Sequence, residues 1–219
     1  MYDPVLDKVY QLFRKGMEYV HREHIYKFKD YSECVFDTQI ESKYWLVGHL
    51  QNPDKRGNRE IKSVDILASW YGVVIVPLLM NYFGKIKINL YDIDEYTCDI
   101  AKFIWKDELD DLVTVHNKDV VFDDLDLKGD AIINCSCEHM FDMSHIVRQY
   151  PDKLYILQSN NNRNIKWLHI NCAEDQGVLA NQADLRQIHF GESKEMYGQK
   201  RIMIIGEHKK GQNVDKSTS

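Results

Sequence analysis

Residues 64–94 constrain the fold more than any other part of the chain. VDILASWYG predicts a hydrophobic strand that closes on a turn, and VVIVPLLMNYF follows it with helical character. KIKINLYDID then predicts a second strand, which ends on Asp92. A strand, a helix and a second strand in this order predict a βαβ arrangement, in which the two strands run parallel.

The position of Asp92 indicates a ligand at this turn. Asp92 lies 20 positions after Gly72, close to the spacing at which a carboxylate grips the ribose hydroxyls of a bound nucleotide. An adenosine-containing ligand is therefore expected. In the plainer alternative, Asp92 is a strand-end carboxylate that caps the next helix. The glycines that usually form such a turn are mostly missing here.

Strands and helices continue to alternate after this unit, which predicts an α/β fold with a parallel sheet and helices on both faces. The expected strands are 61–68, 86–91, 112–116, 130–135 and 153–158, and the expected helices are 73–83, 94–106 and 139–149.

The last two predicted strands break the pattern. LRQIHF (185–190) and RIMIIGEHK (201–209) are separated by only about ten residues, whereas a parallel crossover usually needs about a dozen or more. A hairpin fits this short link, so the final strand is expected to run antiparallel to the others.

The first 60 residues are predicted to be a helical extension. Apolar residues recur at three- and four-residue steps over 4–28, and a second helix is expected over 38–50, before a polar loop at 51–60. The predicted organisation is this extension (1–60), an α/β domain (61–209) and a disordered polar tail (210–219).

Composition places the chain among cytoplasmic globular proteins. Hydrophobic residues make up 44% of it, no apolar run approaches a bilayer span, and the start lacks a signal-peptide pattern. Five cysteines, an odd number, favour free cytosolic thiols over a disulfide framework. A net charge of −6 argues weakly against nucleic acid as a partner, and no membrane partner is expected. The only basic cluster, Lys55, Arg56, Arg59 and Lys62, is interpreted as a solvated loop.

The strand–helix alternation followed by an antiparallel hairpin resembles the class I S-adenosylmethionine (SAM) dependent methyltransferases, over about residues 61–209. The first motif of that family, Gly-x-Gly-x-Gly, falls on Ala68, Trp70 and Gly72, so only its last glycine is kept. Its acidic position falls on Ile66, one residue after Asp65. The whole chain looks like small methyltransferase-like proteins of the kind met in phage genomes.

The resemblance implies SAM as the cofactor and assigns residues to it. Asp92 would bind the ribose, Ile93 would pack on the adenine, and Asp119, followed by Val120, would accept from the adenine amino group. Ala68, Trp70 and Gly72 would face the methionine part. Trp70 either walls the methionine pocket or fills the glycine-lined space, in which case cofactor binding has been lost.

The hexapeptide NCSCEH (134–139) occupies the position of the fourth motif of the family, which faces donor and acceptor. Asn134, which could also contact the cofactor, is predicted to be catalytic together with Glu138 and His139. Glu138 and His139 could act as base and acid. In the structural alternative they simply begin the next helix. A polar loop is expected at 158–164, near the same sheet edge.

Zinc binding is a further alternative for this region. Cysteines and histidines that could ligate zinc lie close together in the sequence, but the usual two-residue cysteine spacing is absent, so no metal is expected. The residues concerned are Cys135, Cys137, His139, His169 and Cys172.

The predicted function is methyl transfer from SAM to a small-molecule, peptide or nucleobase acceptor. One alternative is another SAM reaction, either aminocarboxypropyl transfer or SAM breakdown. The other alternative is a non-catalytic binding or scaffold protein, which is considered because two of the three glycines of the first motif are missing.

Overall fold

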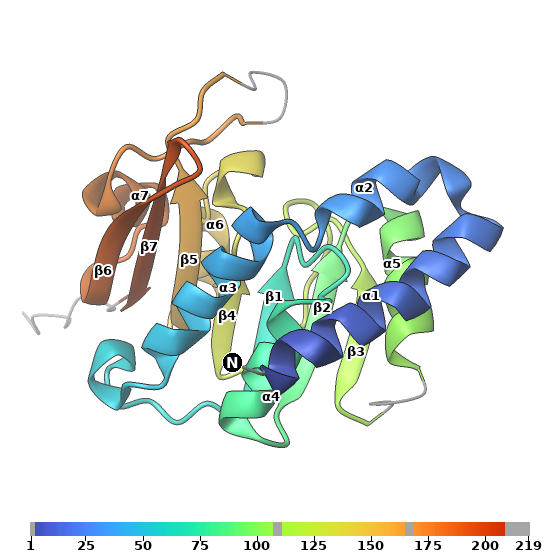
Figure 1. The fold of residues 1–219 in the computed structure, drawn as a ribbon. Helices are drawn as coiled ribbons and strands as arrows, with labels where there is room; N and C mark the ends of the chain where they lie inside the picture. Colours follow the sequence, from blue (N-terminus) through green and yellow to red (C-terminus); the bar gives the residue numbers. More distant parts are fainter. Residues whose placement is uncertain (1–2, 107–110, 165–168, 209–219) are drawn as a thin grey trace, which may run out of the picture.

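A seven-stranded sheet with the order β3-β2-β1-β4-β5-β7-β6 forms the middle of the computed structural model, which describes residues 3–106, 111–164 and 169–208 (Figure 1). Strands β1 to β5 pair in parallel, as the alternating pattern predicts. The strands are β1 Ser63–Leu67, β2 Lys87–Asp92, β3 Val113–Asn117, β4 Ala131–Asn134, β5 Leu154–Asn160, β6 Gln187–Met196 and β7 Gln199–Glu207.

The predicted C-terminal hairpin is confirmed. Strand β7 runs antiparallel to both β5 and β6 and lies between them. Tyr197 and Gly198 have φ angles of 51° and 77°, and a two-residue turn with two positive φ angles matches the twist of an antiparallel pair. Most of the expected ten-residue link therefore belongs to the two strands, which are longer than predicted.

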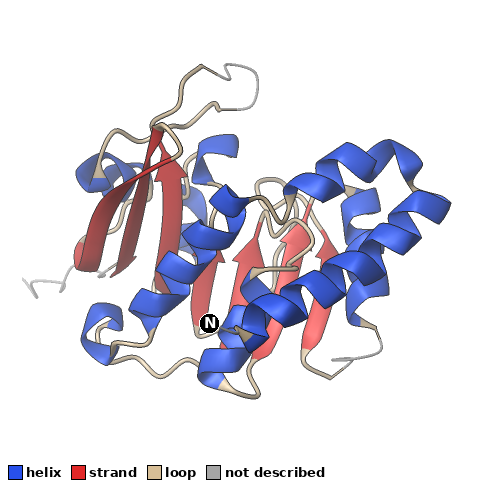
Figure 2. Ribbon diagram, viewed as in Figure 1, coloured by secondary structure: helices blue, strands red, loops and turns tan. Residues whose placement is uncertain are grey.

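Helices cover both faces of the sheet (Figure 2). In Figure 1, α1, α3 and α4 lie in front of the sheet, and α6 and α7 lie behind it. The α-helices are α1 Pro4–Glu23, α2 Phe28–Glu33, α3 Asp37–Leu50, α4 Ile75–Phe83, α5 Glu95–Trp105, α6 Ser144–Gln149 and α7 Gln176–Gln182, and the 3₁₀ turns are η1 Ile25–Lys27, η2 Pro53–Arg56 and η3 Cys137–His139.

The strands divide the apolar core into two clusters, because successive side chains of a strand point to opposite faces. In β4, Ile133 packs with the helices α1, α3, α4 and α5, whereas Ile132 packs with α6 and α7. The N-terminal helices thus share one core with the sheet. Among the described residues, no helix is both long and apolar enough to span a membrane.

The predicted helix over 4–28 is wrong in its length, since α1 ends at Glu23. His24 leaves helical geometry with φ −137° and ψ 46°. Its Nε2 lies 2.8 Å from Asp99 Oδ2 on α5, and the Tyr19 hydroxyl donates to the same oxygen at 2.8 Å. This contact to α5 replaces continuation of the helix, and η1 and α2 follow as separate short helices.

Two other predictions need correction, and one helix was not predicted. The expected helix over 139–149 is a 3₁₀ turn followed by the short α6, which begins only at Ser144. The expected polar loop at 158–164 begins three residues late, because β5 extends to Asn160 and buries its polar side chains. Helix α7 has no counterpart among the predicted elements. The predicted disordered tail at 210–219 lies outside the described residues.

Candidate functional site

The turn between β1 and α4 keeps a left-handed backbone at all three positions where the family has glycine. The φ angles are 48° at Ala68, 54° at Trp70 and 69° at Gly72. Left-handed geometry is costly for residues with a Cβ and is usually left to glycine. The φ angles at these three positions are therefore positive, as in a glycine-rich turn, although alanine and tryptophan replace two of the glycines.

Asp92, at the end of β2, is bound directly to this turn. Its Oδ2 accepts from the Trp70 backbone amide at 2.8 Å, and its Oδ1 accepts from the Asp94 amide at 3.1 Å. Each carboxylate oxygen can accept a second hydrogen bond. Burial raises the pKa of Asp92. Asp92 therefore holds two turns together and still has acceptor capacity for a ligand.

Two cavities meet at Asp92. The larger one, of about 390 Å³, extends toward the N-terminal helices, and the smaller one, of about 210 Å³, extends toward the loop after β3. Ala68, Asp92 and His139 line both cavities. Both cavities open at the carboxyl ends of parallel strands, where α/β sheets bind ligands.

The smaller cavity brings together the residues that the resemblance assigns to adenine. Ile93 is 66% exposed and lines this cavity with Asp119 and Val120. The Asp119 Oδ1 accepts from the Val121 amide at 2.8 Å, which shapes the loop. Apolar side chains together with the Asp92 and Asp119 carboxylates are a suitable lining for a flat, polar-edged ring.

The N-terminal helices form one wall of the larger cavity. Asp30 of α2 accepts from the Tyr71 hydroxyl at 2.6 Å and from the Trp70 indole at 3.4 Å, both through Oδ2. Lys27 pairs with Asp94 at 2.6 Å and with Asp30 at 3.4 Å. The extension is therefore fastened to both ligand-facing turns, those at 68–72 and 92–94.

Lys43 of α3 lines the larger cavity, and its ammonium group donates to Gln39. Burial is the main cause that lowers the pKa of Lys43 to about 8. Cys34 and Cys135 line the same cavity, and burial raises the pKa of both thiols. A lysine with a lowered pKa in a cavity is a candidate for proton transfer or for binding an anionic group.

Of the three residues predicted to be catalytic, the structure brings only His139 to the cavities. Asn134 is fully buried. Its Oδ1 accepts from the Ser136 amide, and its Nδ2 contacts the sulfur atoms of Met140 and Met143. Asn134 is not among the described residues that line either cavity, so its side chain shapes the loop after β4.

Glu138 is also buried, with 2% of its surface exposed. Its Oε1 accepts from Arg201 Nη1 of β7 at 2.8 Å and from Asn160 Nδ2 of β5 at 2.6 Å. An ion pair buried in this way fixes both partners. Glu138 is thus held in the protein interior next to His139, and it is not among the described residues that line the two cavities.

Asp65, the carboxylate nearest to the first motif, lies away from the cavities as well. It is fully buried, and its Oδ2 accepts from the Gly129 amide at 2.7 Å while its Oδ1 accepts from Asn89. A Cβ on Gly129 would lie 2.7 Å from the Asp65 nitrogen. This close approach joins β1 to the segment before β4 and serves the fold.

The sequence prediction missed Asp30 and Lys43, which reach the site from the N-terminal helices. Nothing in their helical pattern separates them from ordinary surface residues. Arg201 did leave a signal, because it opens the otherwise apolar run IMII of β7. A charged residue is almost never fully buried unless it is paired.

No protein-family model matches this sequence, and no curated protein matches it. Solved structures do resemble it. A proposed sarcosine dimethylglycine methyltransferase from Galdieria sulphuraria has a TM-score of 0.58 at 11% identity, over 78% of this chain and 86% of that one. NodS, an N-methyltransferase from Bradyrhizobium japonicum WM9, has a TM-score of 0.56 at 9% identity, over 78% and 96%. A variant of MtNAS in complex with S-adenosylmethionine has a TM-score of 0.53 at 11% identity, over 90% and 72%.

At these identities the similarity concerns the fold. The sheet order, the terminal antiparallel hairpin and the helices on both faces agree with it. The chain therefore has the fold of the class I SAM-dependent methyltransferases.

Proposed function

We propose that this protein binds SAM and transfers its methyl group to an acceptor. The observation that carries the proposal is the left-handed backbone at Ala68, Trp70 and Gly72, joined to Asp92 at the meeting point of two cavities. Cavities of roughly 300–1,000 Å³ are typical of small-molecule sites. The two volumes together, 390 and 210 Å³, fall in that range.

The residues present fit the parts of SAM. Asp92 would accept from the ribose hydroxyls with its remaining lone pairs. Ile93 and Val120 would enclose the adenine, and Asp119 would accept from its amino group. The 68–72 turn would face the methionine part, with the Trp70 indole as a wall.

SAM supplies a methyl group on a positively charged sulfur. The nucleophilic atom of the acceptor forms a bond to the methyl carbon while the carbon–sulfur bond breaks, and sulfur keeps the electron pair. Such an in-line displacement depends mainly on close alignment. His139 lines both cavities and would orient the acceptor or take its proton. Lys43, in its neutral form, is the second candidate for the proton.

A small-molecule acceptor is favoured over a peptide or a nucleobase. The larger cavity is bounded on one side by Asp30, Glu33 and Gln39 of the N-terminal helices and has a volume of about 390 Å³, which is typical of small-molecule sites. The net charge of −6 gives no electrostatic support for nucleic acid. A cytoplasmic location fits the five cysteines, all of which are free.

Calorimetry with S-adenosylhomocysteine tests the proposal. The wild-type chain should bind it, and Asp92→Ala should weaken binding at least tenfold, because about 1.4 kcal/mol of hydrogen bonding to the ribose is lost. Asp126→Ala removes an exposed carboxylate that, within the described part of the chain, pairs only with Lys128, and this substitution should leave binding unchanged. Absence of binding by the wild type at millimolar ligand would contradict the proposal and favour the scaffold alternative.

Aminocarboxypropyl transfer is the second candidate, and Trp70 is the observation that favours it. A bulky indole replaces glycine where the methionine part would lie, so it could present a different carbon of the sulfonium to the acceptor. Mass spectrometry of the spent cofactor separates the two reactions. Methyl transfer leaves S-adenosylhomocysteine, whereas aminocarboxypropyl transfer leaves methylthioadenosine.

A further inference from the structure

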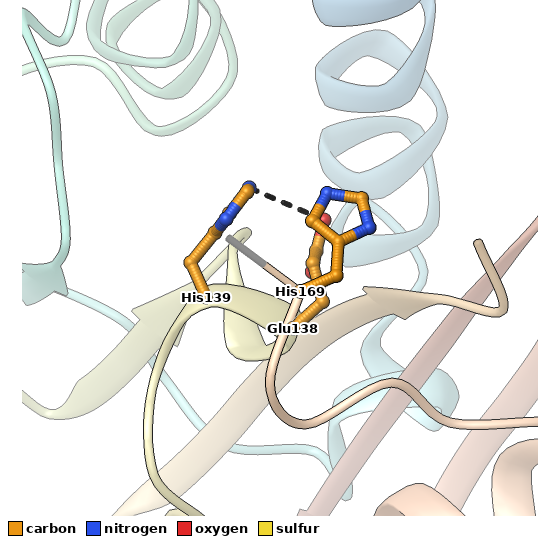
Figure 3. Close-up of side chains that lie close together, drawn as sticks. All are labelled: Glu138, His139 and His169. Atoms are coloured by element: carbon orange, nitrogen blue, oxygen red, sulfur yellow. Dashed lines mark ion pairs between the residues drawn. The ribbon is translucent and has the colours of Figure 1, made fainter. Parts of the chain in front are cut away.

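Glu138, His139 and His169 form a cluster beside the two cavities. One ligand atom from each of the three side chains lies within 4.8 Å of the other two. Figure 3 shows them converging from two segments, the 3₁₀ turn after β4 and the loop after β5. The two imidazole rings are 4.7 Å apart and meet edge to face.

The two oxygen atoms of the Glu138 carboxylate differ in their hydrogen bonding. Its Oε1 accepts from Arg201 and Asn160. Its Oε2 is buried, and no described group donates a hydrogen bond to it. A buried carboxylate oxygen without a donor is costly, so this atom indicates a cation or donor that completes the site. The Oε1 contacts would orient the carboxylate toward that partner.

His169 is oriented in the way that metal-bound histidines usually are. Its Nδ1 lies 2.5 Å from the Asn162 carbonyl oxygen. A carbonyl can only accept, so the Nδ1 carries the proton and the lone pair of the ring lies on Nε2. Metal-ligating histidines typically donate their other ring nitrogen to a carbonyl or carboxylate in this manner.

We propose that Glu138, His139 and His169 bind a divalent first-row transition-metal ion. Glu138 would contribute Oε2, and each histidine would contribute one ring nitrogen. Two imidazoles and one carboxylate are a donor set for such ions and leave coordination positions open. The cysteines that the zinc alternative invoked take no part in this cluster.

Small movements of exposed side chains are enough to complete the coordination. Ligand atoms at about 2.0–2.2 Å from a metal lie at most about 4.4 Å from each other, so the 4.8 Å spread must close by at least about 0.4 Å. The His139 side chain is 42% exposed, and its Nε2 lies 4.0 Å from Glu138 Oε1. Because His139 also lines both cavities, the open coordination positions would lie next to the proposed SAM site.

Titration of the tag-free full-length protein with Co²⁺, followed by visible absorption, tests the site. One equivalent should bind and give the ligand-field bands of a nitrogen- and oxygen-ligated ion, and Zn²⁺ should displace it. His139→Ala and His169→Ala should each weaken binding at least tenfold. His145→Ala is the matched control, because His145 also contacts a backbone carbonyl but does not belong to the cluster. Its Co²⁺ binding should stay at the wild-type level.

The proposal is overturned if the wild type fails to bind Co²⁺ at 1 mM, or if neither cluster substitution weakens binding. Both histidines are partly exposed, so circular dichroism melts should confirm that the variants fold. S-adenosylhomocysteine binding by His169→Ala, measured in parallel, reports on the proposed SAM site independently. Loss of Co²⁺ binding with that affinity retained assigns the metal to the cluster.

Discussion

The backbone amide of Trp70 donates to the Asp92 Oδ2 at 2.8 Å, across the ends of two parallel strands. This bond holds the turn after β1 against the end of β2. It also orients a residue whose left-handed backbone (φ 54°) would otherwise be costly. The carboxylate expected to meet the ribose thus also fixes the turn expected to face the methionine part.

Ala68→Gly should leave the protein as stable as the wild type or up to about 1 kcal/mol more stable. Glycine removes the cost of a Cβ at φ 48°, about 1–2 kcal/mol, and this gain outweighs the greater entropy of the unfolded chain, about 0.4–1 kcal/mol. Urea denaturation measures the difference. Ala101→Gly in α5 is the control and should be destabilising, since Ala101 is helical and buried. Clear destabilisation by Ala68→Gly would show that the turn needs the Ala68 methyl group.

Lys43→Met should stabilise the protein at pH 7 by on the order of 2 kcal/mol. The folded pKa of Lys43, about 8, lies below its ordinary value of 10.5. Below pH 8 the buried charge of Lys43 therefore lowers the free energy of unfolding by its full amount. This destabilisation is lost as the pH rises from 8 toward 10.5, because the folded protein then holds Lys43 in its neutral form. Urea denaturation at pH 7 and at pH 9 measures this change. The difference in unfolding free energy between the variant and the wild type should fall by about 1 kcal/mol from pH 7 to pH 9. An advantage that does not change with pH would mean that Lys43 titrates normally.

Glu138→Gln should cost about 3–5 kcal/mol of unfolding free energy, because it leaves the Arg201 charge buried without its partner. Arg201→Met in the same chain should recover part of that loss. A double-mutant cycle by urea denaturation, with metal absent, measures the coupling. Additive effects of the two substitutions would contradict the pairing.

Asp30→Ala should destabilise the protein by about 1 kcal/mol, because it removes the acceptor for the Tyr71 hydroxyl. The loss of the ion pair with Lys27 should add little, since the Asp30 carboxylate is half-exposed and screened by water. It should also weaken S-adenosylhomocysteine binding several-fold, because α2 loses its attachment to the 68–72 turn. Glu23→Ala, near the end of α1, is a control that keeps this attachment, and should leave both quantities unchanged. Unchanged ligand affinity in Asp30→Ala would show that α2 does not take part in binding.

The sheet and the position of Asp92 could be predicted from the sequence because they depend on local pattern. Alternating strand and helix segments predict parallel pairing, and the short link between the last two strands requires a hairpin. Asp92 is indicated by its distance to Gly72 and by its place at the end of a predicted strand. Each of these inferences uses residues that are close together in the chain.

The rest of the site depends on contacts between distant segments. The left-handed backbone at Trp70 is supported by a bond to a residue 22 positions later, which no turn propensity encodes. Lys43 reaches the larger cavity only because α3 packs beside the sheet. Asn134 and Glu138 stand in the predicted motif, but their direction is set by Met140, Met143 and Arg201. Sequence position therefore located the loop after β4 without showing which of its side chains face the cavities.

The turn at 68–72 also bears on how distant relatives of this protein should be sought. A search pattern that requires glycine letters would reject Ala68 and Trp70, whereas a pattern written as the signs of three backbone torsions would accept them. The turn is defined here by the path of its backbone rather than by the identity of its side chains. Side chains can therefore change there as long as a neighbouring group, here the Asp92 carboxylate, compensates for the lost glycine.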